Sequence, residues 1–121
     1  MRVLVVEDDA DICEAMRQML EWEGYDVACA ANGREALTHL EGAPAKPSLI
    51  LLDLRMPVMD GFAFRKAQLE NAALSGIPVV VVSADMRAGD GTANLQADMI
   101  LRKPVDPEHL LEIVRGYATA S

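Results

Sequence analysis

Short runs of aliphatic residues alternate along this chain with segments in which apolar residues recur every three or four positions. The runs predict five strands, at Arg2–Val6, Tyr25–Ala30, Ser48–Leu52, Ile77–Val82 and Asp98–Leu101. The helical spacing predicts helices at Ala10–Glu23, Arg34–Leu40, Phe62–Glu70 and Glu108–Tyr117. Strand and helix therefore follow one another in turn, with a further helix between the last two strands less clearly marked.

Two dipeptides help to locate helix starts. Asp106-Pro107 combines an acid suited to the N-cap with a proline suited to the first helical position. Asn32-Gly33 has the composition of a hairpin turn, but the apolar residues that follow it have helical spacing rather than strand alternation. We therefore expect a helix after Asn32-Gly33.

The continuous apolar runs LILL (49–52) and VVVV (79–82) are typical of strands covered on both faces, as parallel sheets require. Parallel neighbours need right-handed helical crossovers, which gives a doubly wound α/β architecture. In such a fold, sites form beyond the carboxyl ends of the strands. At 121 residues and 51% hydrophobic, the chain is expected to form one domain over residues 1–121.

Composition excludes several classes of partner. The net charge of −8, from 19 acids against 11 bases, argues against direct nucleic-acid binding, which needs a clustered basic face. The longest apolar stretch, Ile77–Val82, is too short for a membrane span, and the acids from Glu7 onward end the first apolar run before it could act as a signal sequence. A cytoplasmic location follows.

The two cysteines of the chain are Cys13 and Cys29. They lack the spacing of metal ligands, so we expect reduced, packed thiols.

Chemically complementary residues follow four of the predicted strands. They are Glu7 and Asp8, Asp53, Ser83, and Lys103. All should meet at one edge of the sheet, where two like charges about 4 Å apart cost about 4 kcal/mol at an effective dielectric near 20. Lys103 supplies one compensating charge, and a divalent ion that prefers oxygen ligands, most plausibly Mg²⁺, would supply the rest.

The same residues exclude commoner sites of this architecture. No glycine-rich dinucleotide motif follows the first strand, where the acids would repel a pyrophosphate, and no phosphate-binding GxxxxGK[ST] motif is present. A carboxylate beside a metal, a hydroxyl and a lysine is instead suited to receiving a phosphoryl group. Asp53 is the natural nucleophile, because Lys103 and the metal can neutralise the transferring oxygens and Ser83 can donate a hydrogen bond to them.

The segments VLVVEDD, LILLDLRMPVMDG, VVVVSA and LRKP, in this order and spacing, resemble the receiver domain of two-component response regulators over essentially the whole chain. The resemblance implies the flavodoxin-like receiver fold, with strand order 2-1-3-4-5. It also implies that Asp53 accepts phosphate from the phosphohistidine of a histidine kinase. Asp8 and the backbone carbonyl of Arg55 would then bind Mg²⁺ beside Asp53, with Glu7 acting mainly through water.

By the same resemblance, Ser83 would move toward the phosphoryl group, Lys103 would pair with it, and the Lys103–Pro104 peptide would be cis. The partners implied are a sensor histidine kinase or phosphotransfer protein and an unknown downstream target, with the chain a monomer or a phosphorylation-dependent dimer. Such a protein catalyses only its own phosphoryl transfer and autodephosphorylation, and is not an enzyme in the metabolic sense. It could be a stand-alone regulator or part of a longer protein.

Two other functions share features with this chain. An aspartyl-phosphate phosphatase of the haloacid dehalogenase type needs D-x-D, where this chain has Asp53-Leu54-Arg55, and would need room for a cap domain. A degenerate receiver would act as a constitutive protein–protein interaction module, against which the complete set of acids, hydroxyl and lysine argues.

Two departures from the family concern its output. Ile100 stands three positions before the lysine, where receivers commonly have an aromatic residue that reorients. Gly89 and Gly91 predict a short or irregular fourth helix, because each glycine costs about 1 kcal/mol relative to alanine in a helix. We therefore hypothesise that phosphorylation changes the order of residues 85–96. A second hypothesis is that Arg55 and Asp85, two positions after Asp53 and Ser83, pair across the mouth of the site and hinder the attacking water.

Overall fold

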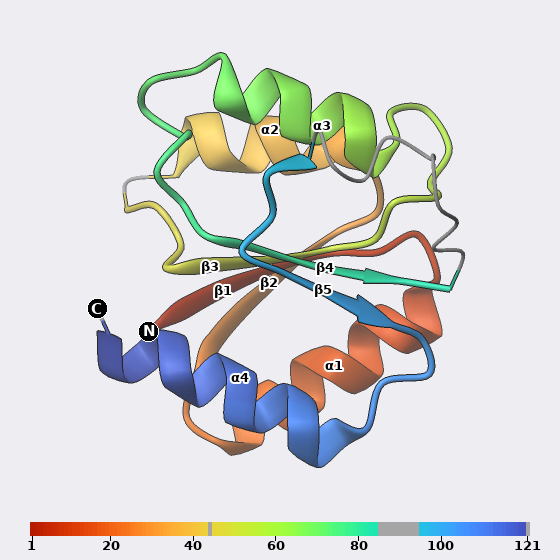
Figure 1. Cartoon of the computed structure of the whole chain (residues 1–121), viewed down its shortest axis with the longest axis vertical. Coiled ribbons are helices and arrows are strands. Elements are labelled where there is room, and N and C mark those ends of the chain that lie inside the picture. Colours follow the sequence, from red (N-terminus) through yellow and green to blue (C-terminus); the bar gives the residue numbers. More distant parts are fainter. Residues whose placement is uncertain (44, 85–94, 121) are drawn as a thin grey trace.

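The computed structural model describes residues 1–43, 45–84 and 95–120. The chain forms one five-stranded parallel sheet in the order β2-β1-β3-β4-β5 (Figure 1). The strands are β1 (Arg2–Val6), β2 (Asp26–Ala30), β3 (Leu49–Leu52), β4 (Val79–Ser83) and β5 (Met99–Arg102). The helices are α1 (Ala10–Trp22), α2 (Gly33–Gly42), α3 (Gly61–Leu69) and α4 (Pro107–Ala120).

Helices cover both faces of the sheet, with α2 and α3 on one side and α1 and α4 on the other (Figure 1). This arrangement confirms the predicted doubly wound fold and its strand order. The boundaries agree to within one to three residues; the largest strand difference is at β4, which was expected to begin at Ile77. Pro78 lacks the amide hydrogen that a residue of a central strand must donate, so β4 begins after this proline, at Val79. At its other end β4 extends to Ser83, which pairs in register with Arg102 of β5.

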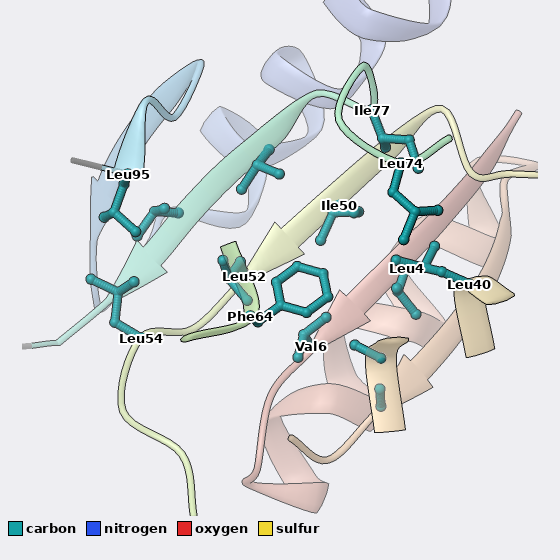
Figure 2. Close-up of a cluster of buried hydrophobic side chains, with 14 residues drawn as sticks. Leu4, Val6, Leu40, Ile50, Leu52, Leu54, Phe64, Leu74, Ile77 and Leu95 are labelled. Atoms are coloured by element: carbon teal, nitrogen blue, oxygen red, sulfur yellow. The ribbon is translucent and has the colours of Figure 1, made fainter. Parts of the chain in front are cut away.

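The core consists of two layers, one on each face of the sheet. Successive residues of the central strands alternate between them: Leu4 and Ile50 belong to the layer under α2 and α3, whereas Val3 and Leu49 belong to the layer under α1 and α4. Figure 2 shows the first layer gathered around the ring of Phe64. Burial on both faces explains why β3 is a continuous aliphatic run.

Side-chain caps fix the starts of three helices that lead away from the same edge of the sheet. The carboxylate of Asp9 accepts hydrogen bonds from the amides of Asp11 (3.0 Å) and Ile12 (3.2 Å). Asn32 caps α2 through the amide of Glu35 at 2.9 Å, and Asp60 caps α3 through the amide of Ala63 at 2.9 Å. A helix thus follows Asn32-Gly33, as expected.

The prediction of reduced thiols is wrong for this structure, which joins Cys13 and Cys29 in a disulfide with Cα atoms 6.4 Å apart. The reason is tertiary: Cys29 is the register partner of Val5 on the neighbouring strand, and the Cys13 sulfur lies 3.9 Å from the carbonyl oxygen of Val5. Two residues without any sequence motif therefore converge on the same point of β1.

The expected irregular fourth helix and its proposed change of order concern residues that lie almost entirely outside the described ones. The same holds for the suggested pair of Arg55 with Asp85. Within the described residues, every helix is too short or too polar to cross a membrane.

Candidate functional site

The strand-end cluster comprises Glu7, Asp8, Asp53, Ser83 and Lys103. Backbone hydrogen bonds that continue the sheet beyond its strands bring these residues together. The amide of Asp53 donates to the carbonyl of Val6 at 3.0 Å, and the amide of Lys103 donates to the carbonyl of Ser83 at 2.9 Å. The parallel sheet therefore delivers to one edge the five residues that the sequence placed at four strand ends.

The acids of this cluster lie close to one another. Glu7, Asp8 and Asp53 each offer a carboxylate oxygen, and these oxygens all lie within 4.8 Å of one another. Glu7 and Asp53 are buried, whereas Asp8 is exposed. Desolvation and the adjacent Glu7 carboxyl raise the pKa of Asp8 above its usual value of 3.8. Desolvation, together with the neighbouring carboxyl, thus already disfavours ionisation of the outermost acid.

Lys103 is the cation of the strand-end cluster. Its ammonium forms an ion pair with Glu7, and its Nζ lies 3.8 Å from Oδ2 of Asp53. The Lys103–Pro104 peptide is cis, as the resemblance implied. One ammonium against three carboxylates leaves an excess of negative charge, and the ligands on offer are hard oxygens. This donor set fits Mg²⁺.

Ser83 supplies an independent sign that something is to be bound here. Its side chain is fully buried, and its hydroxyl has no hydrogen-bond partner among the described residues. Leaving a buried hydroxyl without a partner costs about 1–3 kcal/mol, so such groups are uncommon. At the end of β4, this hydroxyl belongs to the strand-end cluster and is available to a ligand held there.

The loop after β3 approaches Asp53 very closely. A Cβ atom at Gly61 would lie 2.4 Å from the carbonyl oxygen of Asp53, so only glycine fits at the start of α3. In the same loop Val58 adopts a left-handed backbone (φ 68°), which is unusual for a β-branched residue. The guanidinium of Arg55 lies over the ring of Phe62, 5.6 Å from its centroid.

A second polar cluster, which the sequence analysis missed, lies under α3. Arg65 is 5% exposed and donates to the carbonyls of Leu95 and Gln96, both at 2.7 Å, and to the side-chain oxygen of Gln68 at 2.8 Å. Gln68 in turn donates to the carbonyls of Leu74 and Ile77, both at 3.0 Å. We call this set the Arg65 network.

The spacing of α3 carried a signal for this network. The four buried residues of α3 are Gly61, Phe64, Arg65 and Gln68, which follow the period of one helix face. Extending the inner face from Phe64 would have placed a guanidinium and an amide inside the protein. Burial lowers the pKa of Arg65, although an arginine remains charged at any ordinary pH.

The model of the response regulator receiver domain family matches residues 3–115. The chain belongs to this family. An uncharacterized 14.6 kDa protein of Leptolyngbya boryana is 38% identical over 122 residues, which cover 99% of this chain and 92% of that protein. The DNA-binding response regulator MtrA of Mycobacterium tuberculosis is 36% identical over 117 residues, which cover 95% of this chain and 49% of MtrA. This receiver domain thus spans about half the length of MtrA.

Solved receiver structures agree with this assignment. The signal receiver domain of a histidine kinase from Syntrophus aciditrophicus superposes with a TM-score of 0.87 at 30% identity, covering 98% of this chain and 90% of that one. The chemotaxis response regulator CheY4 of Vibrio cholerae gives a TM-score of 0.85 at 31% identity, with 96% and 97% covered. The chain therefore has the fold of the receiver domains of two-component signalling proteins.

Proposed function

We propose that this receiver domain is switched by phosphorylation of Asp53, in a Mg²⁺-dependent transfer from the phosphohistidine of a sensor kinase or phosphotransfer protein. A carboxylate oxygen of Asp53 forms a bond to phosphorus while the bond between phosphorus and the donor histidine nitrogen breaks. The observation that carries the proposal is the buried hydroxyl of Ser83, on the strand next to Asp53, which has no hydrogen-bond partner among the described residues. The phosphoryl oxygens would provide its missing acceptor.

The other members of the strand-end cluster have complementary roles in this proposal. Asp8, Asp53 and the backbone carbonyl of Arg55 would hold Mg²⁺, with Glu7 acting through water; the bound ion would neutralise charge on the phosphoryl oxygens. Lys103 lies 3.8 Å from the Asp53 carboxylate and would exchange its pairing with Glu7 for a phosphoryl oxygen. The phosphorylated domain would then act on a downstream protein, in the cytoplasm, as a monomer or a dimer.

One observation favours a second candidate, a degenerate receiver that acts as a constitutive interaction module. Ile100 is 39% exposed on the edge strand β5 and has no ring or hydroxyl whose reorientation could report phosphorylation. In this case the strand-end cluster would be retained without being used.

Intact mass spectrometry after incubation with acetyl phosphate and Mg²⁺ tests the two candidates. We expect the wild type to gain the mass of one phosphoryl group, and this gain to disappear in Asp53→Asn and on chelation of the metal. Asp60→Asn is the matched control, because it neutralises an acid of the same loop whose side chain caps α3. A folded wild type that gains no mass would favour the constitutive module, and a gain that persists in Asp53→Asn would refute Asp53 as the acceptor.

A further inference from the structure

The disulfide between Cys13 and Cys29 joins the two segments that border the acidic loop of residues 7–9. On one side, the amide of Cys13 donates to the carbonyl of Asp9 at 3.0 Å, in the first turn of α1. On the other side, Ala30, the residue after Cys29, accepts a hydrogen bond from the amide of Glu7 at 2.9 Å. The loop that carries Glu7 and Asp8 is therefore hydrogen-bonded at one end to α1 and at the other to β2, and the disulfide links these two elements.

The two sulfurs differ in their access to solvent. Cys13 is 5% exposed and belongs to the core layer under α1 and α4. Cys29 is exposed on the edge strand β2, where it lines a surface depression together with Arg34 and Glu35. Exchange between thiols and disulfides requires that an attacking thiolate reach one sulfur while the other leaves. The depression gives a small thiol access to Cys29, and Cys13 would be the leaving sulfur.

We propose that Cys13 and Cys29 form a reversible redox site that controls the magnesium affinity of the strand-end cluster. In the oxidising direction, two protein thiols and one low-molecular-weight disulfide give the protein disulfide and two small thiols, with two electrons passing from the protein sulfurs to the small disulfide. The reverse reaction restores the dithiol form. The link to magnesium rests on the function proposed above, whereas the redox transition does not.

The physical basis of the link is the freedom of the acidic loop. In the oxidised form, one covalent bond joins α1 to β2, the two elements whose backbones contact the loop that carries Glu7 and Asp8, so these carboxylates are held near Asp53 before the ion arrives. In the dithiol form, part of that order must be created on binding, which weakens the affinity. A coupling at the lower end of the usual range corresponds to a Kd for Mg²⁺ about five- to tenfold lower in the oxidised form.

The redox transition is tested by equilibrating the protein in buffers with different ratios of glutathione disulfide to glutathione, then trapping free thiols by alkylation and weighing the protein. We expect a reversible two-electron transition between a form with two alkylated thiols and one with none. Cys29→Ser changes the exposed sulfur only and should show no such transition. A wild type that keeps both thiols in oxidising buffer, or that forms only mixed disulfides with glutathione, would overturn the proposal.

The link is tested by calorimetric titration of Mg²⁺ into the wild type in oxidising and in reducing buffer. We expect the lower Kd in oxidising buffer, whereas Cys29→Ser should have the Kd of the reduced wild type in both buffers. Because coupling is reciprocal, saturating Mg²⁺ should shift the thiol–disulfide equilibrium toward the disulfide by the same factor. Equal affinities in both forms, with no shift, would overturn the redox control and leave the proposed function standing. Absence of magnesium binding in both forms would overturn the proposed function and, with it, the link.

Discussion

Two polar clusters lie inside this receiver domain, and they differ in how complete they are. In the Arg65 network, three guanidinium nitrogens and the Gln68 amide each have an acceptor within the protein. In the strand-end cluster, three carboxylates face one ammonium, and the Ser83 hydroxyl has no partner among the described residues. Burial alone therefore does not separate a structural cluster from a functional one.

The two clusters differ in whether their polar groups have hydrogen-bond partners within the described part of the protein. A polar group that is already hydrogen-bonded contributes to stability and has little left to offer a ligand, whereas an unpartnered group costs stability until a ligand arrives. The Arg65 network should accordingly be a large source of stability that is indifferent to magnesium. The strand-end cluster should be a source of instability that magnesium removes.

The largest effect is expected for Arg65→Leu, which leaves the buried carbonyl of Leu95, the partly buried carbonyl of Gln96 and the Gln68 oxygen without their donor. We expect the free energy of unfolding to fall by about 3 kcal/mol, measured by urea denaturation. Arg34→Leu, at an exposed position, is the matched control and should change stability by less than about 0.5 kcal/mol. If the two variants were equally stable, the Arg65 network would not be the structural cluster described here.

A smaller loss, of about 2 kcal/mol, is expected for Gln68→Leu, because the carbonyls of Leu74 and Ile77 lose their donor. The double variant Arg65→Leu/Gln68→Leu should lose less than the sum of the single changes, because each residue is a partner of the other. Urea denaturation of all four proteins gives the coupling. Strict additivity would mean that the two side chains act separately.

The smallest effect, and of opposite sign, is expected for Asp8→Asn in the metal-free protein. An acid whose pKa is higher in the folded state than in the unfolded state destabilises the fold once it ionises, so this cost is present at neutral pH and disappears as the pH falls through the folded-state pKa. Asp8→Asn should therefore slightly raise the thermal midpoint at pH 7 without metal.

The same variant should lose the stabilisation that Mg²⁺ gives the wild type, which is about 2.7 kcal/mol when the ion is present at one hundred times its Kd. Thermal melts with and without Mg²⁺ measure both effects, and Arg65→Leu should keep the full magnesium shift. A magnesium shift that survives in Asp8→Asn, or that disappears in Arg65→Leu, would abolish the contrast between the clusters.

The sequence was informative about residues whose position is set by the strand that they end or follow. Asp53 and Ser83 could be assigned to one sheet edge because parallel strands bring their carboxyl ends together, and the continuous runs at β3 and β4 identified those strands. The Arg65 network could not be found in this way, because the carbonyls that it binds lie 30 and 31 positions further along the chain. The disulfide could not be predicted for a related reason, because it depends on the register of β1 against β2.

The glycine at position 61 has a consequence for how this lineage can change. Any larger residue there meets the main chain of Asp53 and Leu54, so a substitution at position 61 must displace the backbone that carries the Asp53 carboxylate. In a related protein that lacks this glycine, the residue at the position of Asp53 should therefore be displaced, even where every acid of the strand-end cluster is still encoded.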